Sequence, residues 1–418
     1  MTLDNNIDNG VKCRFCESHL NQTFVDLGMS PLCQTHIAPN QLNHMERFYP
    51  LHVYVCEKCF LVQLGEYVSP EEIFSEYAYF SSYSDTWLRH VKAYVDMMQE
   101  RFNLYDRSHV VEIASNDGYL LQFFVQKGIP VLGIEPAANV AQMAVERGIP
   151  TLIKFFGQET AYDVSLKAGK ADLLLGNNVL AHVPNLNDFV SGMKVLLKPQ
   201  GVLTMEFPHL IRLIDENQFD TIYHEHFSYF SFTTVERIFA AHGLTLFDVD
   251  ELSTHGGSLR IYGCHVENTS KPVSKKVADL KSREDTWGVR KMETYSLFAE
   301  RVKATKRSIL KFLIDAKERG KIIAGYGAPG KGNTLLNYCG IRTDFISYTV
   351  DRSPYKQGKY TPGTHIPILH PDKIKETKPD YLFILPWNLK DEIIEQNAFI
   401  RGWGGQFVIP IPEVKVCS

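Results

Sequence analysis

The sequence lacks the marks of a membrane, secreted or nucleic-acid-binding protein. No apolar run approaches the roughly 20 residues that a membrane span needs, and the polar, acidic start MTLDNNIDNG is unlike a secretory signal. Neither sign of charge is in large excess, since 44 Lys and Arg face 48 Asp and Glu, which argues against an electrostatic nucleic-acid binder. Internal repeats, low-complexity tracts and coiled-coil heptads are also missing. We expect a cytoplasmic enzyme without nucleic-acid or membrane partners.

What is present is the length and composition of a multidomain globular protein. At roughly 150 residues per domain, 418 residues predict two or three domains. The 44% hydrophobic and 22% charged residues are typical of a soluble protein with sizeable cores. The sequence leaves the oligomeric state open, and a monomer is compatible with it.

Two Cys-x-x-Cys pairs lie close to the N-terminus, Cys13 with Cys16 and Cys56 with Cys59. Four thiolates are a complete ligand set for a tetrahedral structural Zn²⁺, with no position left open for water. A redox pair or a disulfide is the alternative, but two paired motifs without a secretory signal favour zinc. We predict a small β-rich zinc-binding domain over residues 1–68. The other four cysteines have no ligand spacing and are predicted to be buried apolar side chains.

Strand and helix patterns alternate from residue 108, which predicts a parallel sheet with helices on both faces. The strands HVVEIA, VLGIE, DLLLGN and VLTMEFP are followed by two more, LTLFDVD and GSLRIYG. The polar segment 267–292 is predicted to be a connection, and a second alternation begins at Lys321. We therefore predict an α/β fold, with a Rossmann-like middle domain over 69–266 and a Rossmann-like C-terminal domain over 267–418.

Polar loops after the strands of the middle domain predict a nucleoside pocket. Glu112 ends one strand and Glu135 ends the next, where an acid can accept both hydroxyls of a ribose. The turn E-x-A-x-x-D-G is acidic and poor in glycine, which suits S-adenosylmethionine better than a pyrophosphate. An ordinary strand-to-helix turn is the alternative. The candidate cofactor-binding residues are Glu112, Ala114, Asn116, Gly118, Glu135, Asn177 and Asn178.

A second glycine-rich loop, KIIAGYGAPGKGN, opens the C-terminal alternation. It has G-x-G-x-x-G spacing after an apolar strand, and Asp351 follows the next strand, so alone it is a dinucleotide fingerprint. Lys331 directly after the glycines suits a terminal diphosphate, which favours a sugar nucleotide over NAD. A purely structural loop is the third possibility. The candidate substrate-binding residues are His255, Lys331, Asn333, Thr334, Asp351 and Lys356.

The segment IYHEHFSYF gathers titratable side chains after the fifth strand. Removing a proton next to a ketone needs a base of near-neutral pKa, which His226 can supply. Glu225 can fix the tautomer of a histidine, and the Tyr223 hydroxyl can donate to an enolate oxygen. Of His224 and His226, one is expected to be a structural histidine. His182, in LAHVP, is a second candidate that would orient the substrate ketone.

An aromatic cluster precedes the middle domain at Tyr77, Tyr79, Phe80 and Tyr83. We predict that these rings form a lid over the pocket. Aromatic residues at such spacing are more often part of a core, which is the alternative.

Together these motifs resemble one family, the S-adenosylmethionine-dependent C-methyltransferases that build branched deoxysugars on nucleotide carriers. The resemblance covers nearly the whole chain, through both Cys-x-x-Cys pairs, VEIxxNDG, NNxLAHxP, FDTIYHEHFSYFS, HGGSLR and GYGAxxKGNTLLN. It implies that His226 is the base with Tyr223 and Glu225 as partners, and that the C-terminal domain helps to bind the nucleotide-sugar. Ala114 departs from the family, which commonly has glycine there, so we expect a slightly altered cofactor fit.

The resemblance implies methylation at C-3 of a 4-keto-6-deoxyhexose carried on GDP or dTDP, through an enolate. C-5 methylation stays open because both carbons flank the ketone, and O- or N-methylation would need no enolate. An NAD-dependent oxidoreductase and a non-catalytic zinc-ribbon adaptor are the alternatives from other classes. The intact cluster around His226 argues against an adaptor.

Overall fold

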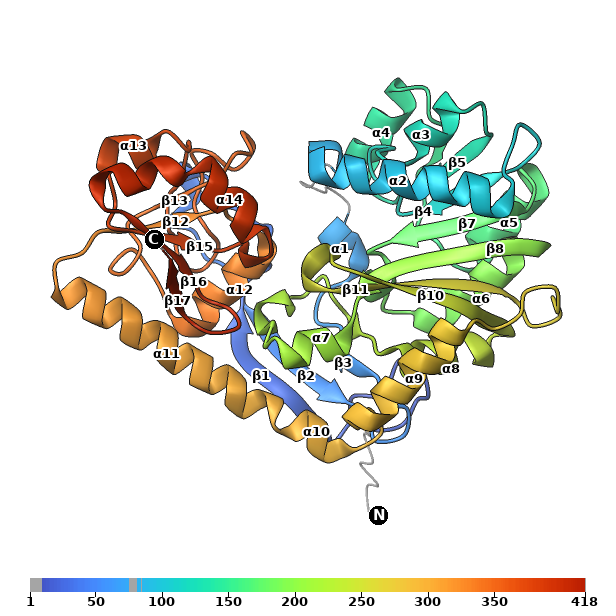
Figure 1. Ribbon diagram of the computed structural model, residues 1–418, viewed down its shortest axis with the longest axis horizontal. Helices are drawn as coiled ribbons and strands as arrows, with labels where there is room; N and C mark the ends of the chain where they lie inside the picture. The colour runs from blue at the N-terminus through green and yellow to red at the C-terminus, as the bar shows by residue number, and fades with distance from the viewer. Residues whose placement is uncertain (1–9, 75–80, 84, 418) are drawn as a thin grey trace, which may run out of the picture.

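The described part of the chain, residues 10–74, 81–83 and 85–417, is built around three β-sheets in the computed structural model (Figure 1). Helices flank the two larger sheets, so the predicted α/β class with a β-rich N-terminal part is confirmed. Among these residues, no helix has both the length and the apolar character that crossing a membrane requires.

The smallest sheet carries the N-terminal cysteine pairs and takes one strand from elsewhere in the chain. Its order is β1-β2-β3-β9, and every pair is antiparallel. The fourth strand follows the IYHEHF segment directly, so this sheet crosses the boundary predicted at residue 68. The bounds are β1 (Gln22–Ser30), β2 (Tyr49–Val55), β3 (Val62–Leu64) and β9 (Ser228–Tyr229).

The largest sheet forms the middle of the molecule, in the order β10-β11-β8-β7-β4-β5-β6. Strands β4 to β8 are parallel, and their apolar runs are buried on both faces. The last two strands are antiparallel because a short turn joins them. The bounds are β4 (Val110–Ile113), β5 (Val131–Ile134), β6 (Thr151–Leu152), β7 (Ala171–Asn177), β8 (Leu197–Pro208), β10 (Leu244–Leu252) and β11 (Ser258–His265).

Helices cover both faces of this sheet, as predicted. One core packs α2 and α3 against one face, and another packs α5, α6 and α8 against the opposite face. Short helices α1 and α7 flank the edge at which the parallel strands end (Figure 1). The bounds are α1 (Pro70–Phe74), α2 (Asp85–Phe102), α3 (Leu121–Gln126), α4 (Ala138–Glu146), α5 (Gln158–Lys167), α6 (Leu186–Leu196), α7 (Leu210–Asp215) and α8 (Phe232–Ala241).

The segment 267–292, predicted to be a connection, instead contains helix α9 (Lys275–Trp287). Only two apolar residues of this helix are buried, so its sequence shows little amphipathic pattern. A buried carboxylate anchors the helix: Glu284 accepts hydrogen bonds from the backbone N–H of Phe232 (2.7 Å) and from Nε2 of His209 (2.8 Å). The sequence-based expectation was wrong because this anchor is polar.

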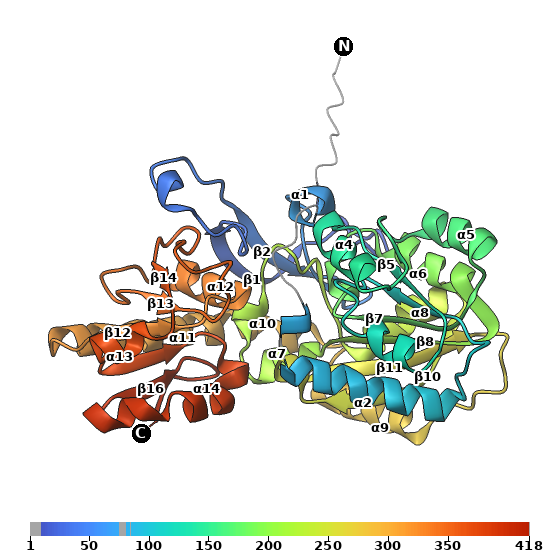
Figure 2. The same ribbon diagram turned by 90° about the horizontal axis from the view of Figure 1, so that it is seen from above.

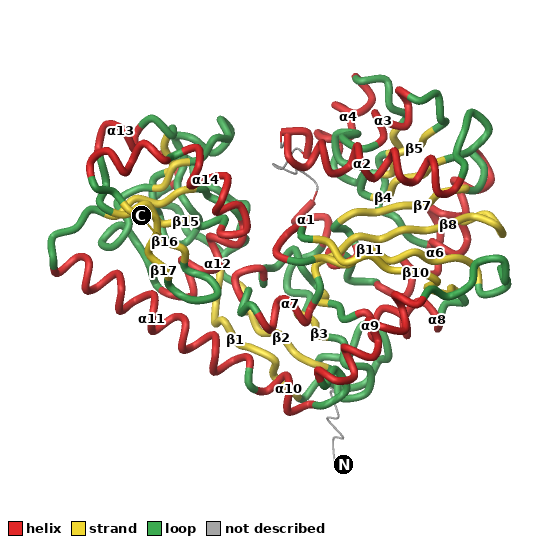
Figure 3. The backbone as a smooth tube through the Cα atoms, in the orientation of Figure 1, coloured by secondary structure: helices red, strands yellow, loops and turns green. Residues whose placement is uncertain are grey.

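The C-terminal part has the predicted second alternation, with sheet order β14-β13-β12-β15-β16-β17. All neighbours are parallel except β17. The long helix α11 runs along the outside of the molecule toward this sheet (Figure 3). The bounds are α10 (Met292–Ser296), α11 (Phe298–Glu318), β12 (Ile323–Tyr326), α12 (Gly330–Cys339), β13 (Thr349–Val350), β14 (Ile368–Leu369), α13 (Lys373–Thr377), β15 (Tyr381–Ile384), α14 (Lys390–Gln396), β16 (Gln406–Ile409) and β17 (Lys415–Cys417).

The N-terminal sheet and the C-terminal part share one hydrophobic core. Phe24 of β1 stacks on Phe298 of α11 with ring centroids 4.6 Å apart. Seen from above, β1 and β2 lie between the middle and C-terminal parts (Figure 2). The zinc-binding region therefore packs against both the middle part and the C-terminal part and is not an isolated domain.

Replacing Glu284 by Gln should lower stability by about 2 kcal/mol, because charge-assisted hydrogen bonds are lost in a buried place. Burial opposes ionisation, but the donors from His209 and Thr233 lower the pKa of Glu284. Its contribution is therefore present above the unfolded-state pKa and disappears as the pH falls. In urea unfolding followed by circular dichroism, the midpoint concentration of the variant should be lower than that of the wild type at pH 7. The difference between the two midpoints should be smaller in acid. Equal midpoints for both proteins at pH 7 would contradict this.

Candidate active site and metal centre

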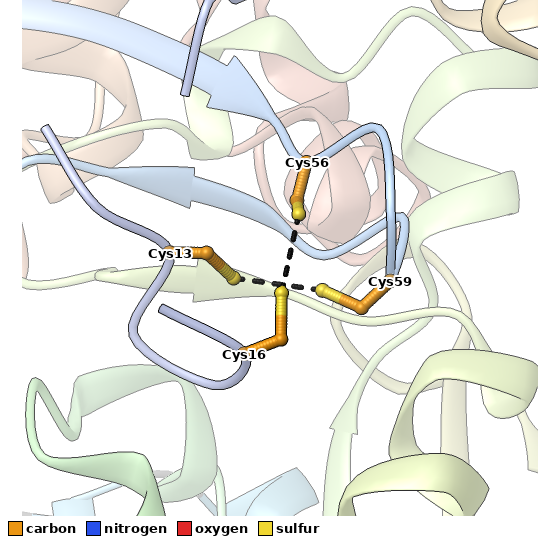
Figure 4. Close-up of side chains that lie close together, drawn as sticks. All are labelled: Cys13, Cys16, Cys56 and Cys59. Carbon is orange, nitrogen blue, oxygen red and sulfur yellow. Dashed lines mark hydrogen bonds between the residues drawn. The ribbon is translucent and has the colours of Figure 1, made fainter. Parts of the chain in front are cut away.

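The four cysteines of the two pairs converge on one point (Figure 4). Their sulfur atoms all lie within 4.8 Å of one another, and Sγ of Cys13 is 3.5 Å from Sγ of Cys59, as Cys16 is from Cys56. A tetrahedral ion with bonds of ~2.3 Å holds its sulfur ligands roughly 3.8 Å apart, so the geometry fits Zn²⁺. The Gln63 amide donates to Sγ of Cys13 (3.1 Å), as an outer partner of a thiolate does. This is a structural zinc site.

The predicted cofactor residues gather at the edge where β4, β5 and β7 end. The strand order reverses between β4 and β7, and such a switch point is where open α/β sheets bind ligands. Glu112 is fully buried, and burial raises its pKa well above the ordinary value. The Glu112 carboxylate and the Asn177 amide make no well-formed hydrogen bond among the described residues, although the Tyr119 hydroxyl lies beside both. Such unsatisfied buried groups fit the polar ends of S-adenosylmethionine.

Glu135, predicted to bind a ribose, braces the cofactor loop in this structure. One carboxylate oxygen accepts from the backbone N–H of Asn116 and the other from that of Ala137, each at 2.9 Å. Burial raises the pKa of Glu135 to about 7. The ribose role remains a prediction.

The backbone of the cofactor loop is left-handed at two residues that carry side chains. Ala114 has φ of +56° and Asn116 has φ of +49°, a region that glycine adopts freely. Position 114 therefore requires a left-handed backbone, and a residue with a side chain adopts that conformation at a cost of about 1 kcal/mol relative to glycine. Gly118 has a separate reason, since a Cβ would lie 2.3 Å from the Ile149 side chain. At Asn178, after β7, φ is likewise +54°.

Tyr223, His226 and His182 form a ring cluster. The ring centroid of His226 lies 4.0 Å from that of Tyr223 and 4.8 Å from that of His182. The backbone N–H of Phe227 donates to the Ala181 carbonyl (2.7 Å), which holds the two segments together. All three residues are half-buried. The structure thus brings together three of the four predicted catalytic residues.

The tautomer of His226 is set by the backbone. Nδ1 lies 2.8 Å from the carbonyl oxygen of Thr221, and because a carbonyl can only accept, Nδ1 carries the proton. Nε2 therefore presents a lone pair. Burial, followed by the nearby charge of His182, lowers the pKa of His226 well below the ordinary value. His226 is therefore neutral at neutral pH.

The neighbours of His226 have other roles. The Glu225 carboxylate accepts from the thiol of Cys33 (3.3 Å), so Thr221 rather than Glu225 holds Nδ1 of His226. The ring of His224 donates from Nε2 to the Pro50 carbonyl (3.2 Å), a contact that fits a structural histidine. That one histidine of the pair is structural remains a prediction.

Two predicted substrate residues fasten the C-terminal part to the rest of the chain. Asn333 donates to the backbone carbonyl of Cys33 (2.6 Å), and the Thr334 hydroxyl donates to that of Ile222 (2.9 Å). Both side chains are buried. This placement gives them a structural task beside the one predicted.

The remaining predicted substrate residues surround the glycine-rich loop. Lys331 donates to the Asn388 amide oxygen (2.9 Å) and lies over the Trp387 ring. Asp351 accepts from the backbone N–H of Ala328 (2.8 Å), and Lys356 donates to the carbonyl of Ala328 (2.9 Å). His255 lies in the short turn between β10 and β11, Thr254–Gly256.

Several residues of this region were not singled out from the sequence. Cys33 gave no signal, because its contact with Glu225 joins positions far apart in the chain. Glu206 lies near the end of β8, in register with Asn177 at the end of β7, so the same strand-end rule could have found it. Of the predicted lid, Tyr77, Tyr79 and Phe80 lie outside the described residues, as does the side chain of Tyr83.

Comparison with known proteins agrees with this geometry. Three family models match the chain: "Putative zinc binding domain" over 13–74, "Methyltransferase domain" over 87–249 and "C-methyltransferase C-terminal domain" over 253–412. The C-methyltransferase NovU of Streptomyces niveus is 36% identical over 410 residues, which cover 97% of each chain. Among solved structures, the magnesium protoporphyrin IX methyltransferase of Synechocystis with bound S-adenosylmethionine is 15% identical, with a TM-score of 0.33 over 43% of this chain and 79% of that one. A methyltransferase of Clostridium acetobutylicum is 11% identical, with a TM-score of 0.35 over 43% and 92%.

The fold and its strand-end loops define an S-adenosylmethionine-dependent methyltransferase. With the match to NovU over nearly its full length, the chain belongs to the family of C-methyltransferases that carry an N-terminal zinc-binding domain. S-adenosylmethionine and a structural zinc ion are its cofactors.

Replacing Cys13 by Ser should release the zinc and lower the melting temperature, while S-adenosylmethionine still binds at the separate edge of the middle sheet. Metal analysis, thermal melting and calorimetry measure the three quantities. Cys417→Ser, at a partly exposed thiol outside the cluster, is the matched control. A wild-type protein that contains no zinc and stays folded in chelator would contradict the four-thiolate site.

Proposed function

We propose that the chain methylates C-3 of a 4-keto-6-deoxyhexose linked to a nucleotide diphosphate, through an enolate. The observation that carries this proposal is His226, a half-buried neutral imidazole whose proton is held on Nδ1 by the Thr221 carbonyl. A C-methyltransferase must create a carbon nucleophile, and a hydrogen next to a ketone is acidic enough for a neutral histidine to remove. The sugar substrate and the C-3 position are the proposed parts of this assignment.

In the proposed reaction, Nε2 of His226 accepts the proton from the carbon next to the ketone. As negative charge develops on the ketone oxygen, the Tyr223 hydroxyl donates a hydrogen bond to it, and the ring of His182 orients it. Burial raises the pKa of Tyr223 well above the ordinary value, so the hydroxyl keeps its proton to donate. S-adenosylmethionine supplies an electrophilic methyl group, and no metal is required at the reacting carbon. Holding both substrates at one sheet edge provides proximity.

We further propose that the C-terminal part helps to bind the nucleotide-sugar, with Lys331 and Lys356 nearest to its diphosphate and Asp351 at the same loop. An NAD site is the weaker assignment for the glycine-rich loop. Both carboxylate oxygens of Asp351 already accept backbone hydrogen bonds, from Ala328 and Ser353, and a Cβ at Gly330 would lie 3.0 Å from Sγ of Cys33. The N-terminal segment thus covers part of this loop. The cytoplasmic location expected from the sequence remains a prediction.

Mass spectrometry of the sugar nucleotide tests the assignment. The protein is incubated with S-adenosylmethionine and, in parallel, dTDP- and GDP-linked 4-keto-6-deoxyhexoses, and the products are fragmented. We expect a gain of one methylene unit on carbon at C-3 with one carrier. A methyl on C-5, oxygen or nitrogen would replace the proposed position or acceptor. Reduction of NAD without methyl transfer would overturn the proposal.

Replacing His226 by Asn should lower the kcat of methyl transfer at least a hundredfold, because the base is lost. S-adenosylmethionine should bind with unchanged affinity in calorimetry, since the cofactor edge is untouched. His224→Asn, which changes the neighbouring structural histidine, is the matched control and should retain far more turnover. Near-normal turnover of the His226 variant would exclude it as the base.

The pH profile reports the same group. At saturating substrate, kcat should fall in acid as Nε2 becomes protonated, with a midpoint below the ordinary histidine value because the pKa of His226 is lowered. The nearby charge of Lys331 contributes to that lowering. Lys331→Met should therefore move the acid limb to higher pH. An acid limb that stays in place, or moves to lower pH, would contradict this electrostatic account.

A further inference from the structure

A buried ionic cluster lies beside the reaction centre, outside the residues discussed above. Glu206 at the end of β8 is fully buried, and it accepts hydrogen bonds from Arg260 on β11 (2.7 Å) and from Nε2 of His90 on α2 (3.0 Å). Arg260 is only 4% exposed. Although burial opposes ionisation, His90 and Arg260 lower the pKa of Glu206 to about 2, so its charge is permanent. Buried charges are costly, and apolar residues would stabilise a core as well or better.

One oxygen of Glu206 holds the turn that carries His255. The Thr254 hydroxyl donates to Oε1 of Glu206 at 2.9 Å. The adjacent residue, His255, has a left-handed backbone with φ of +53°, which is rare for a residue with a side chain. Such a conformation persists only where the surroundings hold it. The hydrogen bond from Thr254 supplies one such restraint.

The other oxygen of Glu206 is connected to His255 through two further side chains, His90 and Trp87. His90, which donates to Oε2, stacks on the indole of Trp87 with ring centroids 4.9 Å apart. That indole meets the ring of His255 edge to face at 5.3 Å. It also lies over Tyr119, beside the cofactor loop, at 6.2 Å. His255 is therefore held through Thr254 and through Trp87, and both routes begin at Glu206.

The place of the cluster connects it to the reaction. Glu206 pairs in register with Asn177, so the cluster lies one strand beyond the cofactor residues. Burial lowers the pKa of His226, and the nearby charges of His182 and, more weakly, His255 add to this, so the turn of His255 lies in the neighbourhood of His226. The turn also meets the C-terminal part, because a Cβ at Gly256 would lie 2.8 Å from the Trp387 ring.

We propose that Glu206 is a positioning residue, which fixes His255 and Trp87 as a pre-formed wall for the keto-sugar. This inference rests on the proposed function. A pre-formed wall spares the substrate the cost of ordering the turn, so its loss should weaken sugar binding more than chemistry or cofactor binding.

Two isosteric variants test the role at different strength. Glu206→Gln removes the charge, and Thr254→Val removes only the hydrogen bond to the turn. Both should raise KM and the calorimetric Kd for the sugar nucleotide, roughly tenfold for Glu206→Gln and less for Thr254→Val, with kcat changed less. The Kd for S-adenosylmethionine should change by less than about twofold.

Glu284→Gln is the matched control, because Glu284 is an equally buried carboxylate that accepts from a histidine, while its hydrogen bonds go to His209, Phe232 and Thr233 and none goes to Thr254 or His255. It should lower stability and leave KM and Kd for the sugar nucleotide unchanged. The inference is overturned if Thr254→Val, folded as judged by circular dichroism, has wild-type KM and Kd, or if Glu284→Gln raises them equally. Sugar-nucleotide binding without methyl transfer by the wild type would overturn the proposed function alone, since Kd still tests the positioning role. Absence of binding by the wild type would overturn both.

Discussion

The candidate active site depends on the hydrogen bonds that the backbone of residues 221–229 makes. The partners in these bonds come from several parts of the chain. The Thr221 carbonyl accepts from Nδ1 of His226, and the N–H of Phe227 donates to the middle domain at Ala181. From the C-terminal part, Thr334 donates to the Ile222 carbonyl, and β9 pairs with β3 of the N-terminal sheet. A base must be placed within a few tenths of an ångström to remove a proton from carbon. Here that placement comes from the backbone and from all three parts of the chain.

This arrangement explains why a metal that takes no part in the chemistry belongs to the enzyme. The zinc ligands Cys56 and Cys59 lie between β2 and β3, and β3 is the strand that pairs with β9. A zinc ion bound there would hold the end of β2 and the start of β3 in place. It would thereby hold the sheet that β9, the strand directly after the His226 segment, joins. The loop after β1 brings Cys33 to Glu225 and to the C-terminal Asn333. The N-terminal region is thus part of the active-site framework.

Much of this could be predicted from the sequence where the signal is local. Paired Cys-x-x-Cys spacing predicted the metal cluster, and apolar runs ending in polar residues predicted the strands that carry Glu112 and Asn177. Helix α9 was missed because its anchor, Glu284, is a polar residue whose partners lie about 50 positions or more away. The Thr221 carbonyl that holds Nδ1 of His226 could not be predicted either, since sequence patterns do not show which backbone carbonyls a side chain meets. The charged cluster at Glu206 joins three elements distant in sequence, and only the fold brings them together.

The central claim is that His226 removes a proton from the carbon next to the sugar ketone. Hydrogen exchange without methyl transfer tests this step alone. The wild-type protein is incubated in deuterium oxide with the keto-sugar nucleotide and S-adenosylhomocysteine, and deuterium is located in the ring by nuclear magnetic resonance. The account predicts exchange at C-3 that disappears in His226→Asn. Exchange that is independent of His226, or none in a wild-type enzyme that methylates carbon, would contradict it.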